Sequence, residues 1–128
     1  MKITFSILLC FLFLHSVAQA QPTSNIMGKW SGVTKSPSTG NELLMQVKIS
    51  EASGTWLYLS HATTRNPCFG REFPLSVETL PNGRVKFSVD GASVITGCPS
   101  FAVTLDRIDE KTLSGAFLDG RPAVLKKQ

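Results

Sequence analysis

Histidine and cysteine are scarce in this sequence, and their scarcity narrows the chemistry open to the protein. The 128 residues include two histidines and three cysteines, with no CxxC pair and no closely spaced histidines. Metal sites are usually built from such clusters of ligands. The Gly-x-Ser-x-Gly motif that carries the nucleophile of many hydrolases does not occur either. We therefore expect no metal, no cofactor and no enzymatic activity.

The excess of basic over acidic residues is also small. Lysine and arginine number 13 and aspartate and glutamate 9, which gives a net charge of +4, and the only adjacent basic pair is Lys126-Lys127. Nucleic-acid binding needs a concentrated basic face, commonly with aromatic residues between the charges. We expect these charges to be solvated on the surface, and we expect no nucleic-acid partner.

Only one long apolar run occurs, from Phe5 to Val17. It follows Lys2, is short for a membrane span and ends at Ala18-Gln19-Ala20, so it has the form of a secretory signal peptide cleaved after Ala20. A lipoprotein acylated at Cys10 is disfavoured, because leucines precede that residue instead of small residues. We expect residues 21–128 to form a single soluble domain, without a membrane span, that is secreted or periplasmic.

No segment repeats with a helical period long enough to predict a helix. The clearest strand is 43–50, in which Leu43, Met45, Val47 and Ile49 alternate with mostly polar residues. Eight such strands are expected, at 26–34, 43–50, 55–60, 74–79, 85–89, 101–105, 112–118 and 121–127. Their short turns, above all Asn82-Gly83, predict an all-β, eight-stranded antiparallel up-and-down barrel, or alternatively a two-layer sandwich. We expect a monomer.

Two details of the strand pattern stay open. In segment 55–60 either face can be the buried one, because Trp56 and Tyr58 lie opposite two leucines. Pro122 has no N–H to donate, so the last strand is expected either to start at a sheet edge or to begin at Ala123.

Two cysteines, Cys68 and Cys98, remain once Cys10 leaves with the signal peptide. An even pair in an exported protein predicts a disulfide. Closing a loop of about 30 residues would stabilise the fold by roughly 3–4 kcal/mol, a large share of the stability of a small domain. The bond would join two irregular segments, 61–74 and 91–100.

The first of these segments carries the candidate binding residues Arg65, Phe69, Arg71 and Phe73. Arginine and aromatic residues dominate the energetics of many protein interfaces, and a pinned loop loses less entropy on binding. The competing interpretation is that both phenylalanines fold back to plug one end of the barrel while the arginines stay in water.

A second set of candidates consists of Trp30, Trp56 and Tyr58, which line either a ligand pocket or the core. His61 is the only histidine after residue 20. A catalytic pair with Cys68 would need a free thiolate, which the expected disulfide removes.

Gly28-Lys29-Trp30 resembles the opening strand of the calycins, the lipocalins, avidins and related small barrels, where a Gly-x-Trp closes the barrel floor. Gly54-Thr55-Trp56 is similar to the third strand of avidin-like barrels. No tryptophan follows Trp56, whereas avidins have several further along, so the resemblance does not imply biotin binding.

The sequence also resembles small periplasmic inhibitors of bacterial metalloproteases, which are eight-stranded barrels with one disulfide. The likeness lies in Gly28-Lys29-Trp30 and in Leu125-Lys126-Lys127 of the last strand. In that family an N-terminal tail enters the protease cleft, and Gln21 to Asn25 would be its short counterpart here.

The combined expectation is an exported, non-enzymatic binding protein, with an inhibitor as its most specific form. It would contact a protein partner through the disulfide-pinned loops 61–74 and 91–100. The alternative is a carrier of a small apolar ligand in the barrel mouth around Trp30, Trp56 and Tyr58.

Overall fold

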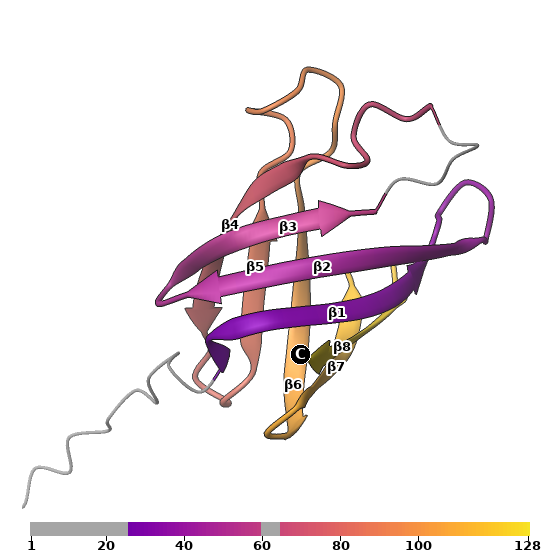
Figure 1. Ribbon diagram of the computed structural model, residues 1–128. Coiled ribbons are helices and arrows are strands. Elements are labelled where there is room, and N and C mark those ends of the chain that lie inside the picture. Colours follow the sequence, from indigo (N-terminus) through magenta and orange to yellow (C-terminus); the bar gives the residue numbers. More distant parts are fainter. Residues whose placement is uncertain (1–25, 60–64) are drawn as a thin grey trace, which may run out of the picture.

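Eight antiparallel strands form a closed barrel in the computed structural model, which describes residues 26–59 and 65–128 (Figure 1). The strands are β1 (Gly28–Lys35), β2 (Glu42–Ser50), β3 (Ser53–Tyr58), β4 (Glu72–Thr79), β5 (Val85–Val89), β6 (Phe101–Asp109), β7 (Thr112–Phe117) and β8 (Pro122–Lys127). The predicted barrel is therefore confirmed over the alternative sandwich. The predicted signal segment 1–20, the tail 21–25 and His61 lie outside the described residues.

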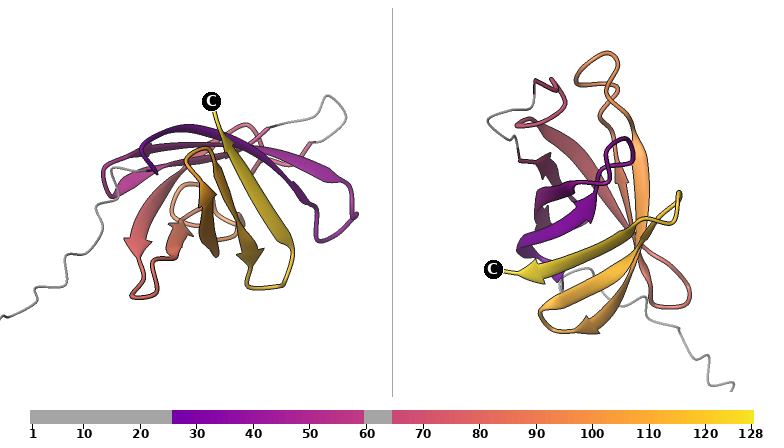
Figure 2. Two further views of the ribbon diagram at one scale, coloured as in Figure 1. Left: turned by 90° about the horizontal axis from the view of Figure 1, so that it is seen from below. Right: turned by 90° about the vertical axis from the view of Figure 1, so that its right-hand side faces the viewer.

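Each strand pairs with the next one in the chain, and β1 pairs with β8 to close the barrel. The closing pairs run from Trp30 opposite Lys127 to Val33 opposite Val124. Figure 2 shows from two further directions how the strands curve around a common interior. Full closure gives every strand a hydrogen-bonded neighbour on both sides, so no sheet edge is left open.

The interior of the barrel is the hydrophobic core. On β2 the side chains of Leu43, Met45, Val47 and Ile49 are buried and the residues between them are exposed, as the alternation predicts. Among the largest fully buried side chains are Trp30, Trp56, Phe73, Phe87, Met45, Leu105, Leu113 and Leu125. Each such side chain stabilises the fold by roughly 1.5–3 kcal/mol.

The Asn82-Gly83 signal does mark a hairpin, between β4 and β5. Leu80 N donates to Arg84 O at 2.8 Å, which leaves Pro81, Asn82 and Gly83 as a three-residue loop. Gly83 has a φ of 83°, a left-handed conformation that glycine adopts without a steric penalty.

Several strand boundaries differ from the sequence-based expectation, and two open details are resolved. β4 begins at Glu72, not at Pro74, so Phe73 is a strand residue with its side chain in the core. Pro74 is tolerated in β4 because it lies where the hydrogen-bond ladder between β4 and β5 ends. Its carbonyl accepts from Asp90 N, just beyond β5, and the N–H that proline lacks would lie at the same end of this ladder. The inward face of β3 is the one that carries Trp56 and Tyr58. β8 begins at Pro122, which is paired with Ala116.

The two ends of the barrel differ in the length of their connections. One end, here called the mouth, carries four connections, which include the longest in the barrel: 36–41, 90–100, 118–121 and the described part 65–71 of the β3–β4 connection. The opposite end carries three tight turns, with Ile26 and Gln128 beside them. In Figure 1 the mouth connections lie toward the top and right.

Candidate binding site at the barrel mouth

A cavity of about 260 Å³ lies at the mouth, and all four connections contribute to its lining. The connections supply Ser36, Pro37, Ser38, Asn66, Cys68, Phe69, Pro99 and Arg121, and the strand ends supply Leu43, Tyr58, Phe73 and Phe101. The lining is mostly apolar, with a few polar groups. This is the usual composition of a binding pocket.

The predicted disulfide is confirmed and joins two of the four connections. Cys68 and Cys98 have an S–S distance of 2.06 Å and Cα atoms 5.6 Å apart. Cys98 is buried against the core and Cys68 is partly buried. The bond therefore fixes segment 65–71 against segment 90–100 beside the cavity.

Local hydrogen bonds hold segment 65–71 in shape. The side-chain carbonyl of Asn66 accepts from Cys68 N at 2.9 Å, and the Asn66 backbone carbonyl accepts from Phe69 N at 3.1 Å. Gly70 N donates to Tyr58 O at 2.7 Å, which ties the segment back to the end of β3. Asparagine at this position favours the turn because its side chain mimics a backbone carbonyl.

Segment 90–100 is organised by Asp90. Its carboxylate accepts from Ser93 N at 3.2 Å and from the Ser100 hydroxyl at 3.0 Å. Hydrogen bonding by Ser93, through side chain and backbone, and then by Ser100 lowers the pKa of Asp90 below its usual value. Together with the disulfide at Cys98, these contacts hold both ends of the segment.

An aromatic cluster forms the floor and one wall of the cavity. The ring centroid of Tyr58 lies 5.8 Å from that of Phe69 and 5.9 Å from that of Phe101. Beneath them, Trp56 packs edge-on against Tyr58 at 5.8 Å and against Phe101 at 5.4 Å. These contacts join the rim of the cavity to the barrel core.

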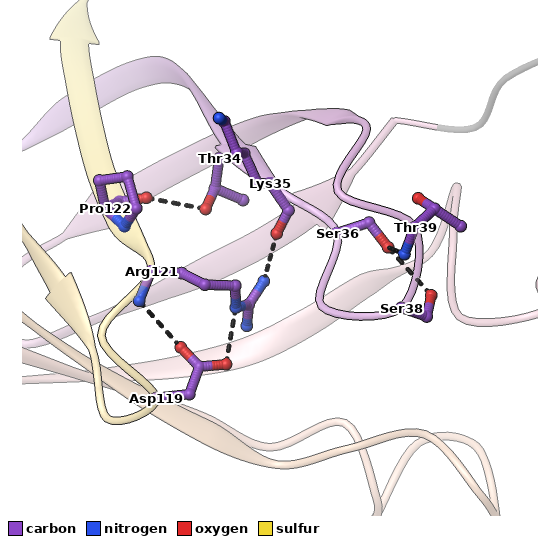
Figure 3. Close-up of polar contacts among 8 residues, drawn as sticks. All are labelled: Thr34, Lys35, Ser36, Ser38, Thr39, Asp119, Arg121 and Pro122. Carbon is purple, nitrogen blue, oxygen red and sulfur yellow. Dashed lines mark hydrogen bonds and ion pairs between the residues drawn. The ribbon is translucent and has the colours of Figure 1, made fainter.

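Arg121 forms part of the polar side of the cavity, and Figure 3 shows its polar contacts. Its Nε donates to Asp119 at 2.7 Å, and its Nη1 donates to the backbone carbonyl of Lys35 at 2.6 Å. The guanidinium carbon also lies 4.5 Å from the centroid of the Phe117 ring. An ion pair, a hydrogen bond to a backbone carbonyl and a contact with an aromatic ring thus fix the Arg121 side chain where β1 meets β8.

Burial of the Tyr58 hydroxyl raises its pKa to about 12, although the charge of Arg121 and the indole N–H of Trp56 oppose this shift. The hydroxyl is therefore protonated at neutral pH and can donate a hydrogen bond into the cavity.

The phenylalanines and arginines predicted as site residues lie in different surroundings. Phe69 is partly buried at the cavity and Phe73 is 1% exposed. Arg65 and Arg71 are exposed and make no hydrogen bond or ion pair with another residue that the structure describes. The structure therefore has the arrangement of the competing interpretation, with phenylalanines folded inward and arginines in water.

Placing Trp30 at the mouth was wrong. Trp30 lies near the start of β1, at the opposite end, where its indole N–H donates to Ile26 O at 2.8 Å and Lys127 lies over its ring. The cause is strand direction, since β1 reaches the mouth only at Lys35. Trp56 and Tyr58 do lie in the half of β3 nearest the mouth, with Trp56 0% exposed beneath the cavity.

Three further residues at the mouth were missed from the sequence. Phe101 and Arg121 line the cavity, and Leu118, at the β7–β8 turn, is 93% exposed. Leu118 stands directly before Asp119-Gly120, and an apolar residue beside a turn signal was a usable clue. No local pattern marks Phe101 or Arg121, because barrel closure brings them to the cavity.

No family model matches the chain, and no curated protein or solved structure matches it either. Within residues 26–59 and 65–128 there is no cluster of three or more His, Cys, Asp or Glu side chains suited to a metal ion. The same residues contain no helix that is long and apolar enough to cross a membrane. The case for a function therefore depends on the mouth itself.

Proposed function

We propose that this protein is a non-enzymatic binding protein that contacts a protein partner with the mouth of its barrel. The observation that carries the proposal is the aromatic-lined cavity whose rim belongs to segments pinned by Cys68–Cys98. A rigid rim loses little conformational entropy on binding, and an apolar pocket buries one anchoring side chain of the partner.

The size of the cavity favours a protein partner over a free small ligand. Pockets that enclose a drug-sized molecule usually measure roughly 300–1,000 Å³, and this cavity measures about 260 Å³. It suits a single side chain, with further contact area supplied by the surrounding rim. That rim presents Leu118 and the cationic side chains Arg65 and Arg71 to solvent.

We further propose that the protein acts outside the cytoplasm. A disulfide persists in oxidising compartments and is rare in the reducing cytosol. The Cys68–Cys98 bond supports this location, together with the signal-like character of residues 1–20. An inhibitor, with a secreted or periplasmic enzyme as the partner, remains the most specific form of the proposal.

The test is affinity capture from the native extracellular or periplasmic fraction with paired variants. Leu118→Asp places a charge on the mouth, and Ile108→Asp does the same at the opposite end, where Ile108 is 62% exposed on β6. We expect Leu118→Asp, and also Arg71→Ala, to reduce capture of the partner at least about 10-fold, and Ile108→Asp to leave it unchanged. Equal capture by all variants would exclude the mouth as the binding surface.

The alternative is a carrier of a small apolar ligand. It is supported by the aromatic lining from Tyr58, Phe69 and Phe101. A carrier would show saturable quenching of tryptophan fluorescence by small apolar compounds, and Leu118→Asp would not change that affinity.

A further inference from the structure

The indole N–H of Trp56 is a buried donor with no hydrogen-bond partner among the described residues. The Trp56 side chain is 0% exposed, so water does not freely solvate this group. An unpaired buried donor is costly, and proteins keep few of them. The other indole N–H in the same core, that of Trp30, does have a partner, because it donates to Ile26 O.

Tyr58 lies between this indole and the cavity. Tyr58 lines the cavity, whereas Trp56 does not. The Trp56 N–H is close enough to the Tyr58 hydroxyl to lower its pKa, but the contact falls short of the geometry of a full hydrogen bond. A hydroxyl that donates its proton to a bound acceptor becomes a better acceptor itself, so a ligand on Tyr58 would also strengthen its interaction with Trp56.

Three side-chain acceptor groups at or beside the cavity are already engaged. The Asn66 side-chain oxygen accepts from Cys68 N, and both carboxylate oxygens of Asp119 accept from Arg121. The hydroxyls of Ser36 and Ser38 are hydrogen-bonded to each other.

The donors are not all occupied. The hydroxyl of Tyr58 and the Nη2 group of Arg121 have no hydrogen-bond partner in the part of the chain that the structure describes. The cavity therefore offers a ligand at least these two hydrogen-bond donors.

From these two donors and the aromatic lining we propose that the mouth cavity recognises a ring-sized apolar group that carries an acceptor oxygen, with the Tyr58 hydroxyl and the Arg121 guanidinium donating to that oxygen. This inference rests on the proposed function, because the group would be the anchor that the partner inserts into the mouth. A carbonyl and a carboxylate share this chemistry, and a cationic or purely hydrocarbon group lacks it.

The volume agrees with such a group. A cavity of about 150 Å³ is known to hold a benzene ring, and this one measures about 260 Å³. The difference leaves room for a short polar extension beyond the ring. The rings of Phe69 and Phe101 would flank the apolar part, and the oxygen would point toward Tyr58 and Arg121.

Four small probes of similar shape test the inference on the full mature chain: phenylacetate, phenylacetamide, phenethylamine and toluene. The chain has two tryptophans, so a ¹H–¹⁵N spectrum contains two indole N–H signals. We expect the two oxygen-bearing probes to shift the Trp56 signal saturably and to leave the Trp30 signal at the other end unmoved. They should bind at least about 5-fold more tightly than the other two probes.

Tyr58→Phe is the matched variant, because it removes only the hydroxyl and keeps the ring. It should weaken phenylacetamide about 5- to 10-fold while the Trp30 signal stays in its native position, which shows that the fold is intact. Tighter binding of phenylacetate than of phenylacetamide would assign the larger share of the binding free energy to Arg121. Equal affinities would assign the larger share to Tyr58.

Three results would overturn the inference: toluene or phenethylamine binding as tightly as the oxygen-bearing probes, unchanged affinity in Tyr58→Phe, or no shift of the Trp56 signal by any probe. If the probes fail while partner capture is still lost in Leu118→Asp, the anchor chemistry is wrong and the proposed function stands. If capture is also insensitive to Leu118→Asp, both are wrong.

Discussion

The guanidinium of Arg121 donates to the backbone carbonyl of Lys35 at 2.6 Å, although the two residues are 86 positions apart in the chain. Next to it, the Thr34 hydroxyl donates to the Pro122 carbonyl at 2.8 Å (Figure 3). Both bonds cross the seam where β8 meets β1. The polar wall of the cavity is therefore also part of the closure of the barrel.

Arg121→Ala should lower the free energy of unfolding by about 1–2 kcal/mol. The substitution removes a charge-assisted bond to a carbonyl and the contact with the Phe117 ring, at a side chain that is mostly buried. Urea denaturation measures the change. Arg107→Ala is the control, because Arg107 is exposed and its Nε lies 3.4 Å from Asp109 O, and it should change stability by less than about 0.5 kcal/mol. Equal losses would contradict the role assigned to Arg121.

Replacing both Cys68 and Cys98 by serine should reduce the free energy of unfolding by roughly 3–4 kcal/mol. The loop that the bond closes spans 30 positions, and its removal frees the unfolded chain more than the folded one. Urea unfolding of the variant beside the oxidised protein gives the value. As an independent check, an alkylating reagent without reductant should label neither cysteine, and full labelling of both would show that the bond is not formed.

Gly115→Ala should destabilise the barrel by about 2 kcal/mol or more, because a Cβ there would overlap the backbone carbonyl of Thr104 on the neighbouring strand. Gly83→Ala is the comparison, since a Cβ at Gly83 meets nothing and only its left-handed φ of 83° is penalised. That penalty is about 1 kcal/mol. Thermal unfolding of both variants ranks the two costs, and a larger loss for Gly83→Ala would refute the close approach of β6 and β7.

The stability of the protein should fall at high pH because of Tyr58. Its folded pKa is about 12 and its ordinary value is 10.0. Below pH 10 the hydroxyl is protonated in both states, and its contribution to stability is fully present. Between pH 10 and 12 the unfolded chain ionises first, so the free energy of unfolding decreases by up to roughly 2–3 kcal/mol.

Tyr58 is the only tyrosine, so ultraviolet absorbance of tyrosinate reports on it alone. Tyr58→Phe should lose this part of the pH dependence. A midpoint of ionisation near 10 in the folded protein would show that the hydroxyl is not buried.

Much of the fold could be predicted because one face of each strand must be buried. The alternation around Met45 and Val47 places β2 correctly, and the turn residues Asn82-Gly83 place the β4–β5 hairpin. The pairing of Cys68 with Cys98 followed from the expectation that Cys10 leaves with a signal segment, so that one pair of cysteines remains. These are local or exclusive signals that need no knowledge of the neighbouring strands.

The cavity could not be predicted in the same way. Tyr58, Phe101 and Arg121 meet there because of strand register and closure, and no short stretch of sequence encodes either of these. The inward face of β3 was ambiguous for the same reason, since Trp56 and Leu57 are both suitable core residues. Phe73 was assigned to a loop because Pro74 looks like the first residue of a strand, although its missing N–H lies at the end of a ladder.

The mouth and the described chain ends lie at opposite ends of the barrel. This arrangement determines where the protein can be attached to a support without covering the mouth. Gln128 N donates to Lys29 O at the far end of the barrel, and the six residues of β8 separate Gln128 from the mouth. At about 3.3 Å per residue that separation is roughly 20 Å along the strand. A sensor surface, fluorophore or scaffold subunit coupled after Gln128 would therefore leave all four mouth connections facing outward. Copies coupled side by side on such a scaffold would present their mouths as one array.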